Sequence, residues 1–423
     1  MSARKLFRRK PGNSTSKVGA ISPKSDQRNF PISPVFNGLG FFLTNLHWIH
    51  LGVSTTGELD IMNRMTVTEI TTRSSIFRRN MDSFVQYEFL SQRGFADELG
   101  VEYKWLRRLC HRGLERVDRR TQSDLERIAD RFGLQLSDLW REETADRFVP
   151  IENQVLVKWT GSKRLQAEEI VRRFPRHIES YYEPFVGGGS VLYRLLKSNI
   201  KVNRYRCSDT CRPLIELWRL VKDNPRELVL RYEEMWRRLQ VERAAYYQSV
   251  RDEFNVSRCP ALFFFLLRTC RNGLIRFNRE GAFTAAFHHG RSGMKPETVR
   301  RIILDWSTTL RKHDVRFYCR NYQRIQSSAG DLLYLDPPYR ISPRFILYDG
   351  PFDFEKFFRW LRKQQSDYLL SLNGFSGEID MRVDVPVDLY NEHLLVDSGT
   401  SSLARMNGNE SSALRDSLYI SRK

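Results

Sequence analysis

Residues 179–198, ESYYEPFVGGGSVLYRLLKS, decide the fold. An aromatic run ending at Phe185 leads into three consecutive glycines, Gly187 to Gly189, and a helical pattern starts at about Ser190. A strand, a glycine-rich turn and a helix N-terminus form the place where doubly wound sheets bind nucleotide-like ligands, because glycine permits close backbone approach. The spacing is neither G-x-G-x-x-G nor a Walker loop, so phosphate binding is not implied. The alternative is a tight connection without a ligand.

Further short apolar runs alternate with long helical stretches over residues 150–423, at 205–209, 331–338 and 367–374. This alternation predicts an α/β fold with a largely parallel sheet. Asp209 ends the first of these runs, where adenosine-binding sheets place a carboxylate on ribose hydroxyls. Asp209 could equally cap the helix that follows, or share the two roles with Thr210.

The run GDLLYLDPPYR, residues 330–340, ends a predicted buried strand in Asp336, two prolines and Tyr339. Pro337 and Pro338 remove two N–H donors and fix a rigid turn, so Asp336 and the Pro337 carbonyl are both available as acceptors. Tyr339 offers a flat face to a planar ring. Two acceptors beside an aromatic ring suit the exocyclic amine of a nucleobase, although Asp-Pro also occurs in ordinary turns.

The amino-acid composition indicates the kind of partner and the cellular compartment to expect. The 423 residues carry a formal net charge of +19 with a pI of about 9.8, which favours a polyanionic partner such as nucleic acid. Six scattered cysteines are typical of reduced thiols, and their spacing predicts no metal site. The apolar stretch 40–53 is too short and too polar to span a bilayer, and the basic N-terminus lacks a secretory apolar region. We therefore expect a cytoplasmic protein that binds neither membrane nor metal.

Two segments precede the α/β region. Residues 1–80 are rich in Ser, Pro, Lys and Arg, which predicts a basic, disordered arm. Residues 83–145 have apolar positions at helical spacing, and the set Ala96, Gly100, Val101 and Leu106 resembles the helix-turn-helix signature. In such a motif the second helix enters the major groove of DNA. It would present Lys104, Arg107 and Arg108, while a docking module is the alternative reading.

Three motifs in order resemble the Dam-like DNA adenine-N6 methyltransferases, which use S-adenosylmethionine. They are KWTGSKR at 158–164, EPFVGGGS at 183–190 and DPPY at 336–339. A fourth segment, RTCRNGLIRFNREGAFTAAFHHGRSG at 268–293, is similar to part of the family's DNA-recognition insertion. The resemblance covers about residues 153–423. It departs from the family at Thr284-Ala285-Ala286, where N-x-P is usual, and at Ser162, where glycine is usual.

The resemblance implies a Rossmann-like methyltransferase domain at 150–423, with a mostly helical insertion at about 225–310, preceded by a small all-α helix-turn-helix domain. It assigns the cofactor site to Trp159, Lys163, Glu183, Pro184, Phe185, Gly187, Gly189, Asp209 and Asp336. It assigns the flipped adenine to Asp336, Pro337, Pro338 and Tyr339, and DNA contacts to Asn272, Arg276 and Asn278.

The predicted function is therefore site-specific methylation of adenine N6 in duplex DNA, without a metal ion. A restriction endonuclease partner is compatible with it. Two alternatives stay open. The methyl acceptor could be another amine (RNA adenine, cytosine N4 or a protein amide), or the chain could be a DNA-binding regulator with an inert methylase domain.

Overall fold

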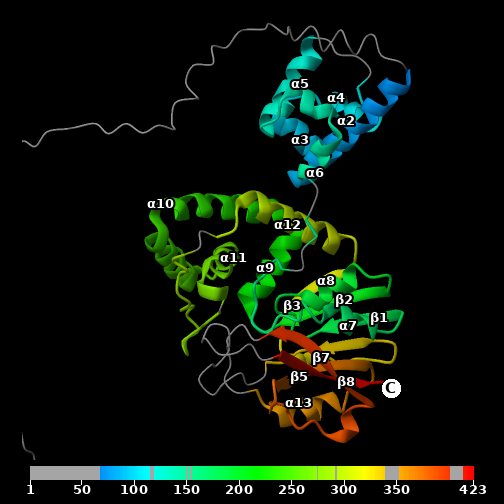
Figure 1. Cartoon of the computed structure of the whole chain (residues 1–423), viewed down its shortest axis with the longest axis vertical. Helices are drawn as coiled ribbons and strands as arrows, with labels where there is room; N and C mark the ends of the chain where they lie inside the picture. The colour runs from blue at the N-terminus through cyan, green and yellow to red at the C-terminus, as the bar shows by residue number, and fades with distance from the viewer. Residues whose placement is uncertain are drawn as a thin grey trace, which may run out of the picture. The chain divides into compact units, whose positions relative to one another are not determined.

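The computed structural model describes residues 67–114, 119–148, 151–152, 155–273, 275–290, 293–338, 352–400 and 413–423 (Figure 1). Residues 1–66 and Tyr339 lie outside this set. Within it, no helix is long and apolar enough to cross a membrane.

A set of helices forms the first described region. Its elements are α2 (Val67–Tyr87), α3 (Gln92–Leu99), α4 (Tyr103–Arg112), α5 (Arg119–Arg131), η1 (Leu136–Trp140) and α6 (Glu142–Phe148). The disordered arm predicted for residues 1–80 is wrong over 67–80, because α2 begins at Val67. Phe77, Met81 and Phe84 lie on one face of α2 and are fully buried in the core of these helices. The Ser- and Thr-rich composition hid that apolar spacing.

The helix pair predicted to bind DNA is present as a local structure. Ser91 caps α3 by accepting a hydrogen bond from the Gly94 N–H. Gly100 ends α3 at φ 66°, a conformation that favours glycine, and its N–H bonds carbonyls of the last turn. Gly100, Val101 and Glu102 then connect α3 to α4. DNA binding by this pair stays a prediction.

One eight-stranded sheet organises the second region. Its strands are β1 (His177–Glu183), β2 (Lys201–Asp209), β3 (Val315–Cys319), β4 (Leu332–Leu335), β5 (Asp367–Ser376), β6 (Ile379–Asp380), β7 (Glu392–Thr400) and β8 (Ala413–Ser421). Their order is β3-β2-β1-β4-β5-β8-β7, with β6 paired to β5. The five strands from β3 to β5 are parallel, whereas β6, β7 and β8 pair antiparallel. The predicted Rossmann-like α/β fold is confirmed.

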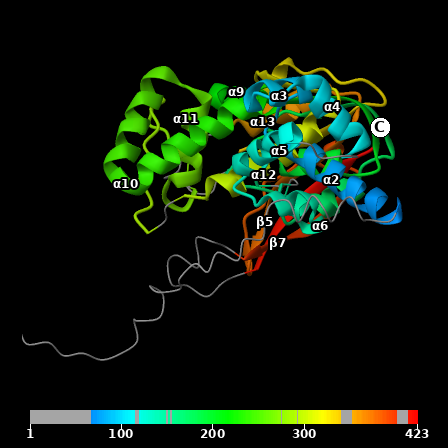
Figure 2. The same ribbon diagram turned by 90° about the horizontal axis from the view of Figure 1, so that it is seen from above.

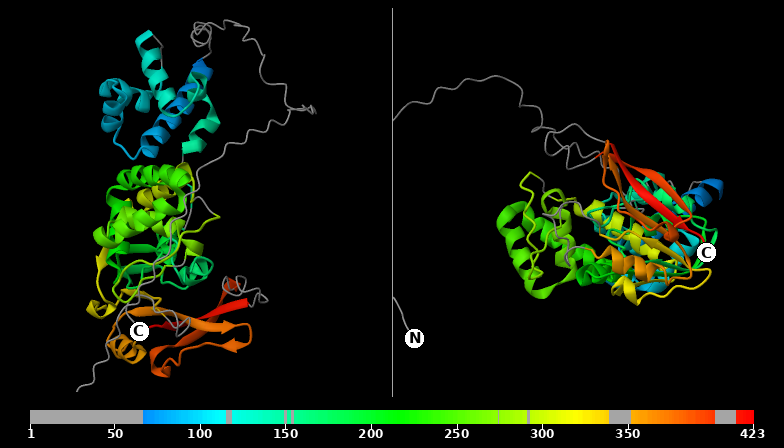
Figure 3. Two further views of the ribbon diagram at one scale, coloured as in Figure 1. Left: turned by 90° about the vertical axis from the view of Figure 1, so that its left-hand side faces the viewer. Right: turned by 90° about the horizontal axis from the view of Figure 1, so that it is seen from below.

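The antiparallel half forms a long ribbon at the red end of the colour scale (Figure 3). All four residues of β4 are buried, as expected of a strand covered on both faces.

Helices α7 (Ala167–Arg172), α8 (Ser190–Leu196), α9 (Arg212–Asp223) and α13 (Phe354–Leu361) belong to the sheet domain, with the short turns η3 (Tyr322–Arg324) and η4 (Val387–Leu389). Between α9 and β3 the chain forms α10 (Pro225–Ser257), α11 (Pro260–Thr269), η2 (Arg271–Gly273) and α12 (Pro296–Arg311). This is the position predicted for the helical insertion.

The insertion is built around one apolar helix. Residues 261–269 of α11 are all buried, so this helix is a core element on every side. Figure 2 shows α11 beside α10, which bends at Arg243, where the backbone leaves helical geometry.

Candidate active site

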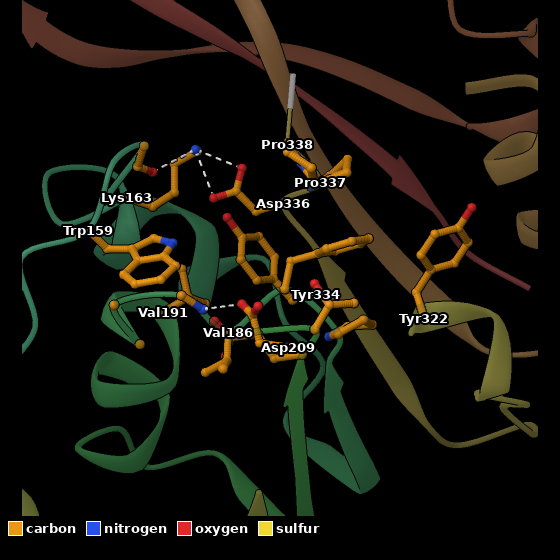
Figure 4. Close-up of a pocket in the computed structure, with 18 of the residues that line it drawn as sticks. Trp159, Lys163, Val186, Val191, Asp209, Tyr322, Tyr334, Asp336, Pro337 and Pro338 are labelled. Atoms are coloured by element: carbon orange, nitrogen blue, oxygen red, sulfur yellow. Dashed lines mark hydrogen bonds and ion pairs between the residues drawn. The ribbon is translucent and has the colours of Figure 1, made fainter. Parts of the chain in front are cut away.

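A cavity of about 370 Å³ lies at the carboxyl ends of the parallel strands. The strand order reverses between β1 and β4, and open α/β sheets bind ligands in the crevice at such a point. Glu183 ends β1 and Asp336 follows β4, so the two carboxyl groups flank the reversal. All nine residues predicted for the cofactor site line this cavity, together with Pro337 and Pro338. Figure 4 labels Trp159, Lys163, Asp209 and Asp336 among them.

The glycine turn is shaped by the side chains packed against it. Gly187 has φ 45° and Gly189 has φ 68°. A Cβ atom on Gly187 would lie 2.8 Å from the Trp159 ring, and one on Gly189 would lie 3.0 Å from the Trp218 ring. The Trp218 indole N–H also donates to the Gly187 carbonyl at 3.0 Å. The turn therefore has both a backbone and a spatial requirement for glycine.

Asp209 ties the glycine turn to the next helix. One carboxylate oxygen accepts the Gly187 N–H at 3.3 Å and the other accepts the Cys211 N–H at 3.0 Å. Cys211, rather than Asp209 or Thr210, is the N-cap residue of α9. Asp209 and Thr210 both line the cavity.

Asp336 is held by a buried lysine. The Lys163 Nζ lies 2.7 Å from Oδ1 and 2.9 Å from Oδ2 of Asp336, and it donates to the Gly161 carbonyl at 3.0 Å (Figure 4). Burial raises the pKa of Asp336 to about 6, Lys163 opposes this rise, and the Asp416 carboxylate adds to it. At pH 7 Asp336 is therefore mostly an ionised acceptor.

Glu183 has a more perturbed carboxyl group. Its side chain is fully enclosed, and burial raises its pKa to about 8. The Tyr181 hydroxyl donates to it at 2.8 Å, which lowers this pKa, whereas the negative charge of Asp336 raises it. Strongly shifted carboxyl groups in a cleft are typical of functional sites.

Comparison with known proteins assigns this chain to a family. The D12 class N6 adenine-specific DNA methyltransferase family matches residues 159–365. DNA adenine methylase of Serratia marcescens is 30% identical over 194 residues, which are 44% of this chain and 67% of that protein. This chain belongs to the D12 class of N6 adenine-specific DNA methyltransferases.

Two further relatives are similar. DNA adenine methylase of Escherichia coli (strain K12) is 32% identical over 194 residues, 44% of this chain, and the match spans 66% of that protein. The type II methyltransferase M.MjaIII of Methanocaldococcus jannaschii is 29% identical over 250 residues, 52% of this chain and 84% of that protein. A solved rRNA methyltransferase from Streptomyces viridochromogenes covers 60% of this chain and 83% of its own, at 15% identity and a TM-score of 0.28. That score is too low to support an inference.

This D12-class site also contains residues that the sequence motifs did not indicate. They come from the turn after β3 and from the start of α13: Asn321, Tyr322, Gln323, Phe352, Asp353 and Lys356. The centre of the Tyr322 ring lies 5.6 Å from that of Phe185 and 5.8 Å from that of Phe352, so these three rings form an aromatic cluster in the cavity lining. The alternating VRFYC pattern of β3 was the available signal, because a parallel strand would bring its carboxyl end to the same edge.

Two of the predicted DNA contacts, Arg276 and Asn278, are not among the described residues that line the cavity. Arg276 is exposed, and Asn278 closes a turn by accepting the Ala282 N–H at 2.7 Å. Thr284, the first residue of the departure from N-x-P, donates its N–H to the Arg276 carbonyl at 2.8 Å. Asn272 lies in η2. Ser162, the other departure, shares a hydrogen bond with the Ser190 hydroxyl at 3.0 Å.

The buried carboxyl of Glu183 predicts a pH dependence of stability. Between pH 4.5 and 8 the folded chain keeps a proton on Glu183 that the unfolded chain has lost. The free energy of unfolding therefore falls as pH rises through this window, by up to about 1.4 kcal/mol per pH unit. Glu183→Gln lacks this titrating group. The difference in free energy of unfolding between wild type and Glu183→Gln, measured by urea unfolding, should therefore change between pH 5 and pH 8. Glu392→Gln, at an exposed position on β7, is the control; a parallel pH profile for wild type and Glu183→Gln would contradict the expectation.

Proposed function

We propose that this protein transfers a methyl group from S-adenosylmethionine to the exocyclic N6 amine of adenine at specific sites in duplex DNA. The observation that carries the proposal is the position of Asp336-Pro337-Pro338 in the same cavity as the turn at Gly187. The first supplies acceptors for an amine and the second supplies a backbone surface for a nucleoside. Family membership supports the same activity.

The cavity fits a cationic nucleoside cofactor. Gly187 and Gly189 leave the turn without side chains, so its backbone is open to a ligand, and the Tyr322 side supplies aromatic rings. The Asp336 carboxylate supplies a negative charge for a cationic group, and Glu183 adds a carboxyl group that keeps its proton up to about pH 8. Trp159, Lys163, Pro184, Phe185 and Asp209 would complete the binding site. When bound, S-adenosylmethionine supplies a methyl group on a positively charged sulfur, an electrophile that needs no metal to activate it.

The residues after β4 would orient the acceptor nitrogen. The Asp336 carboxylate and the Pro337 carbonyl would each accept one N–H of the adenine amine, which aims the nitrogen lone pair at the methyl group. The two prolines contribute no competing donor. Tyr339 would stack on the base. Adenine must leave the duplex stack to reach this position, at a cost of a few kcal/mol that pocket contacts offset.

A labelling experiment tests the function. Wild-type protein with S-[methyl-³H]adenosylmethionine and duplex DNA is expected to yield N6-methyladenine as the labelled base after digestion. Label only in N4-methylcytosine, only with RNA, or only in protein would contradict the proposal. Full biological effect of an Asp336→Ala variant that has lost all methylation would instead favour the regulator.

The +19 charge and the resemblance of residues 268–293 support DNA as the substrate. Asn272, Arg276 and Asn278 would contact it from the insertion. We also propose a cytoplasmic setting, as expected for an enzyme similar to bacterial DNA adenine methylases, and a restriction endonuclease partner is compatible with the similarity to type II methyltransferases.

The exposed cations on α4 give a separate prediction. Replacing Lys104, Arg107 and Arg108 together by glutamine is expected to weaken DNA binding and to flatten its dependence on salt, because each phosphate contact contributes about 0.9 to the slope of log K against log salt. Fluorescence anisotropy over a salt series measures this slope, and cofactor affinity serves as the control. An unchanged slope would favour a docking role for α3 and α4.

A further inference from the structure

Lys163 occupies the acceptor that the proposed reaction needs. Its side chain is 4% exposed, and its ammonium contacts both oxygens of Asp336. The exocyclic amine of the base, which the proposed function places on Asp336, would compete with Lys163 for these oxygens. A buried ammonium that loses its partner is strongly destabilised. The Gly161 carbonyl is a neutral acceptor for Lys163, so base entry favours a second carboxylate that can balance the ammonium charge.

Asp416 provides such an acceptor. Its Oδ2 lies 3.9 Å from the Lys163 Nζ, just beyond a direct charged hydrogen bond. The same oxygen accepts the Gln166 side-chain amide at 2.9 Å, and this amide also contacts the Ser398 hydroxyl. Gln166 is 2% exposed. Asp416 is thus held beside Lys163 by a buried network.

Irregularities in both neighbouring strands surround Asp416. The β5–β8 register shifts at Gly374, and the β7–β8 register shifts at Ser398, the residue that contacts Gln166. A Cβ atom on Gly374 would lie 2.2 Å from the Arg415 carbonyl oxygen, so only glycine fits there. Bulges next to active sites re-aim side chains. The position of Asp416 is therefore fixed by the strands on either side.

We propose that Asp416 is a positioning residue for methyl transfer, which receives the Lys163 ammonium when the substrate amine takes its place on Asp336. A movement of the ammonium by about 1 Å would form the new pair. Lys163 stays paired throughout, and Asp336 gains acceptor capacity for the base. This inference rests on the proposed function.

The charges around Asp336 predict how the pH profile of kcat/KM changes in Asp416→Asn. Among the described residues, four ionisable groups interact with it: Lys163, Asp416 from β8, Glu183 from β1 and Tyr334 from β4. The Asp416 charge raises the pKa of Asp336. In Asp416→Asn that charge is gone and Lys163 stays on Asp336. The acid limb of kcat/KM should move to lower pH while its plateau falls about 10-fold, the size of coupling usual between contacting residues.

A double-mutant cycle separates this role from structural damage. Lys163→Met removes the moving group, so adding Asp416→Asn to it should not lower the plateau further, although loss of the Asp416 charge still moves the acid limb to lower pH. Asp416→Glu should restore most of the wild-type profile, and asparagine keeps an acceptor for Gln166, so folding is preserved by design. Additive losses in the cycle, or an unshifted acid limb in Asp416→Asn, would overturn the inference.

A readout without substrate keeps the inference distinct from the function. The titration of Asp336 can be followed by ¹³C NMR of protein labelled at aspartate carboxyl carbons, with the signal assigned by its loss in Asp336→Asn. Asp416→Asn is expected to lower its midpoint. If the midpoint of Asp336 is unshifted in Asp416→Asn while the wild-type protein methylates DNA, the inference is overturned and the proposed function stands. A shifted midpoint in a protein that methylates no nucleic acid overturns the proposed function.

Discussion

Replacing Asp336 by asparagine is expected to lower the rate of methyl transfer to duplex DNA at least about 100-fold, as the loss of one oriented group in an enzyme site usually does. Asparagine keeps the shape of the side chain, but it replaces one acceptor oxygen by a donor NH₂ that faces the N–H groups of the amine. The acceptor pair with the Pro337 carbonyl is then broken. Single-turnover rates with labelled cofactor measure the chemical step directly.

Measurements of cofactor binding and stability show whether the loss of rate in Asp336→Asn arises in the chemical step. Asparagine removes the charge that pairs with Lys163, so some loss of stability is expected, with Asp416 remaining as a nearby carboxylate. Calorimetric cofactor affinity should nevertheless change far less than the rate. Glu355→Gln, an exposed carboxylate on α13, is the matched control and should behave as wild type. A single-turnover rate within 3-fold of wild type, which is a change of about 0.6 kcal/mol in activation free energy, would show that Asp336 does not take part in the mechanism.

The parts of the site that the sequence predicted are encoded locally. The turn at Gly187 and the sequence from Asp336 each combine a strand, a break and chemically informative residues within about ten positions. Parallel strands bring their carboxyl ends to one edge, so two such stretches in one domain predict one cavity. That explains why Glu183, Asp209 and Asp336 line the same cavity.

The missing parts depend on pairing between distant segments. Asp416 lies beside Lys163 because β8 pairs antiparallel with β5. This pairing contains a register shift that the residue pattern did not predict. Tyr322 enters through β3, which lies beyond β2 at the sheet edge. The Val67 start of α2 was missed for another reason: its apolar face is sparse, and tertiary packing rather than helix propensity holds it.

The second large effect is expected from Gly189→Ala. Gly189 has φ 68°, and an added Cβ would lie 3.0 Å from Trp218 and 3.2 Å from Trp306. Both tryptophan side chains are fully buried, so neither can swing away. The turn must therefore shift, and we expect cofactor affinity to fall at least about 100-fold, with a loss of stability of about 1–3 kcal/mol from strain and overpacking.

Gly133→Ala separates the two origins of this effect. Gly133 has φ 60°, close to that of Gly189, but nothing lies within 4 Å of its added Cβ, and it belongs to the helices at 67–148 rather than to the cavity. The backbone strain is thus matched, while the contact with the tryptophans and the site is absent. Gly133→Ala should lose a similar increment of stability from strain and keep wild-type cofactor affinity in calorimetry. If Gly189→Ala bound the cofactor as tightly as Gly133→Ala, the turn would not be the surface on which the cofactor lies, and the cavity would need another ligand.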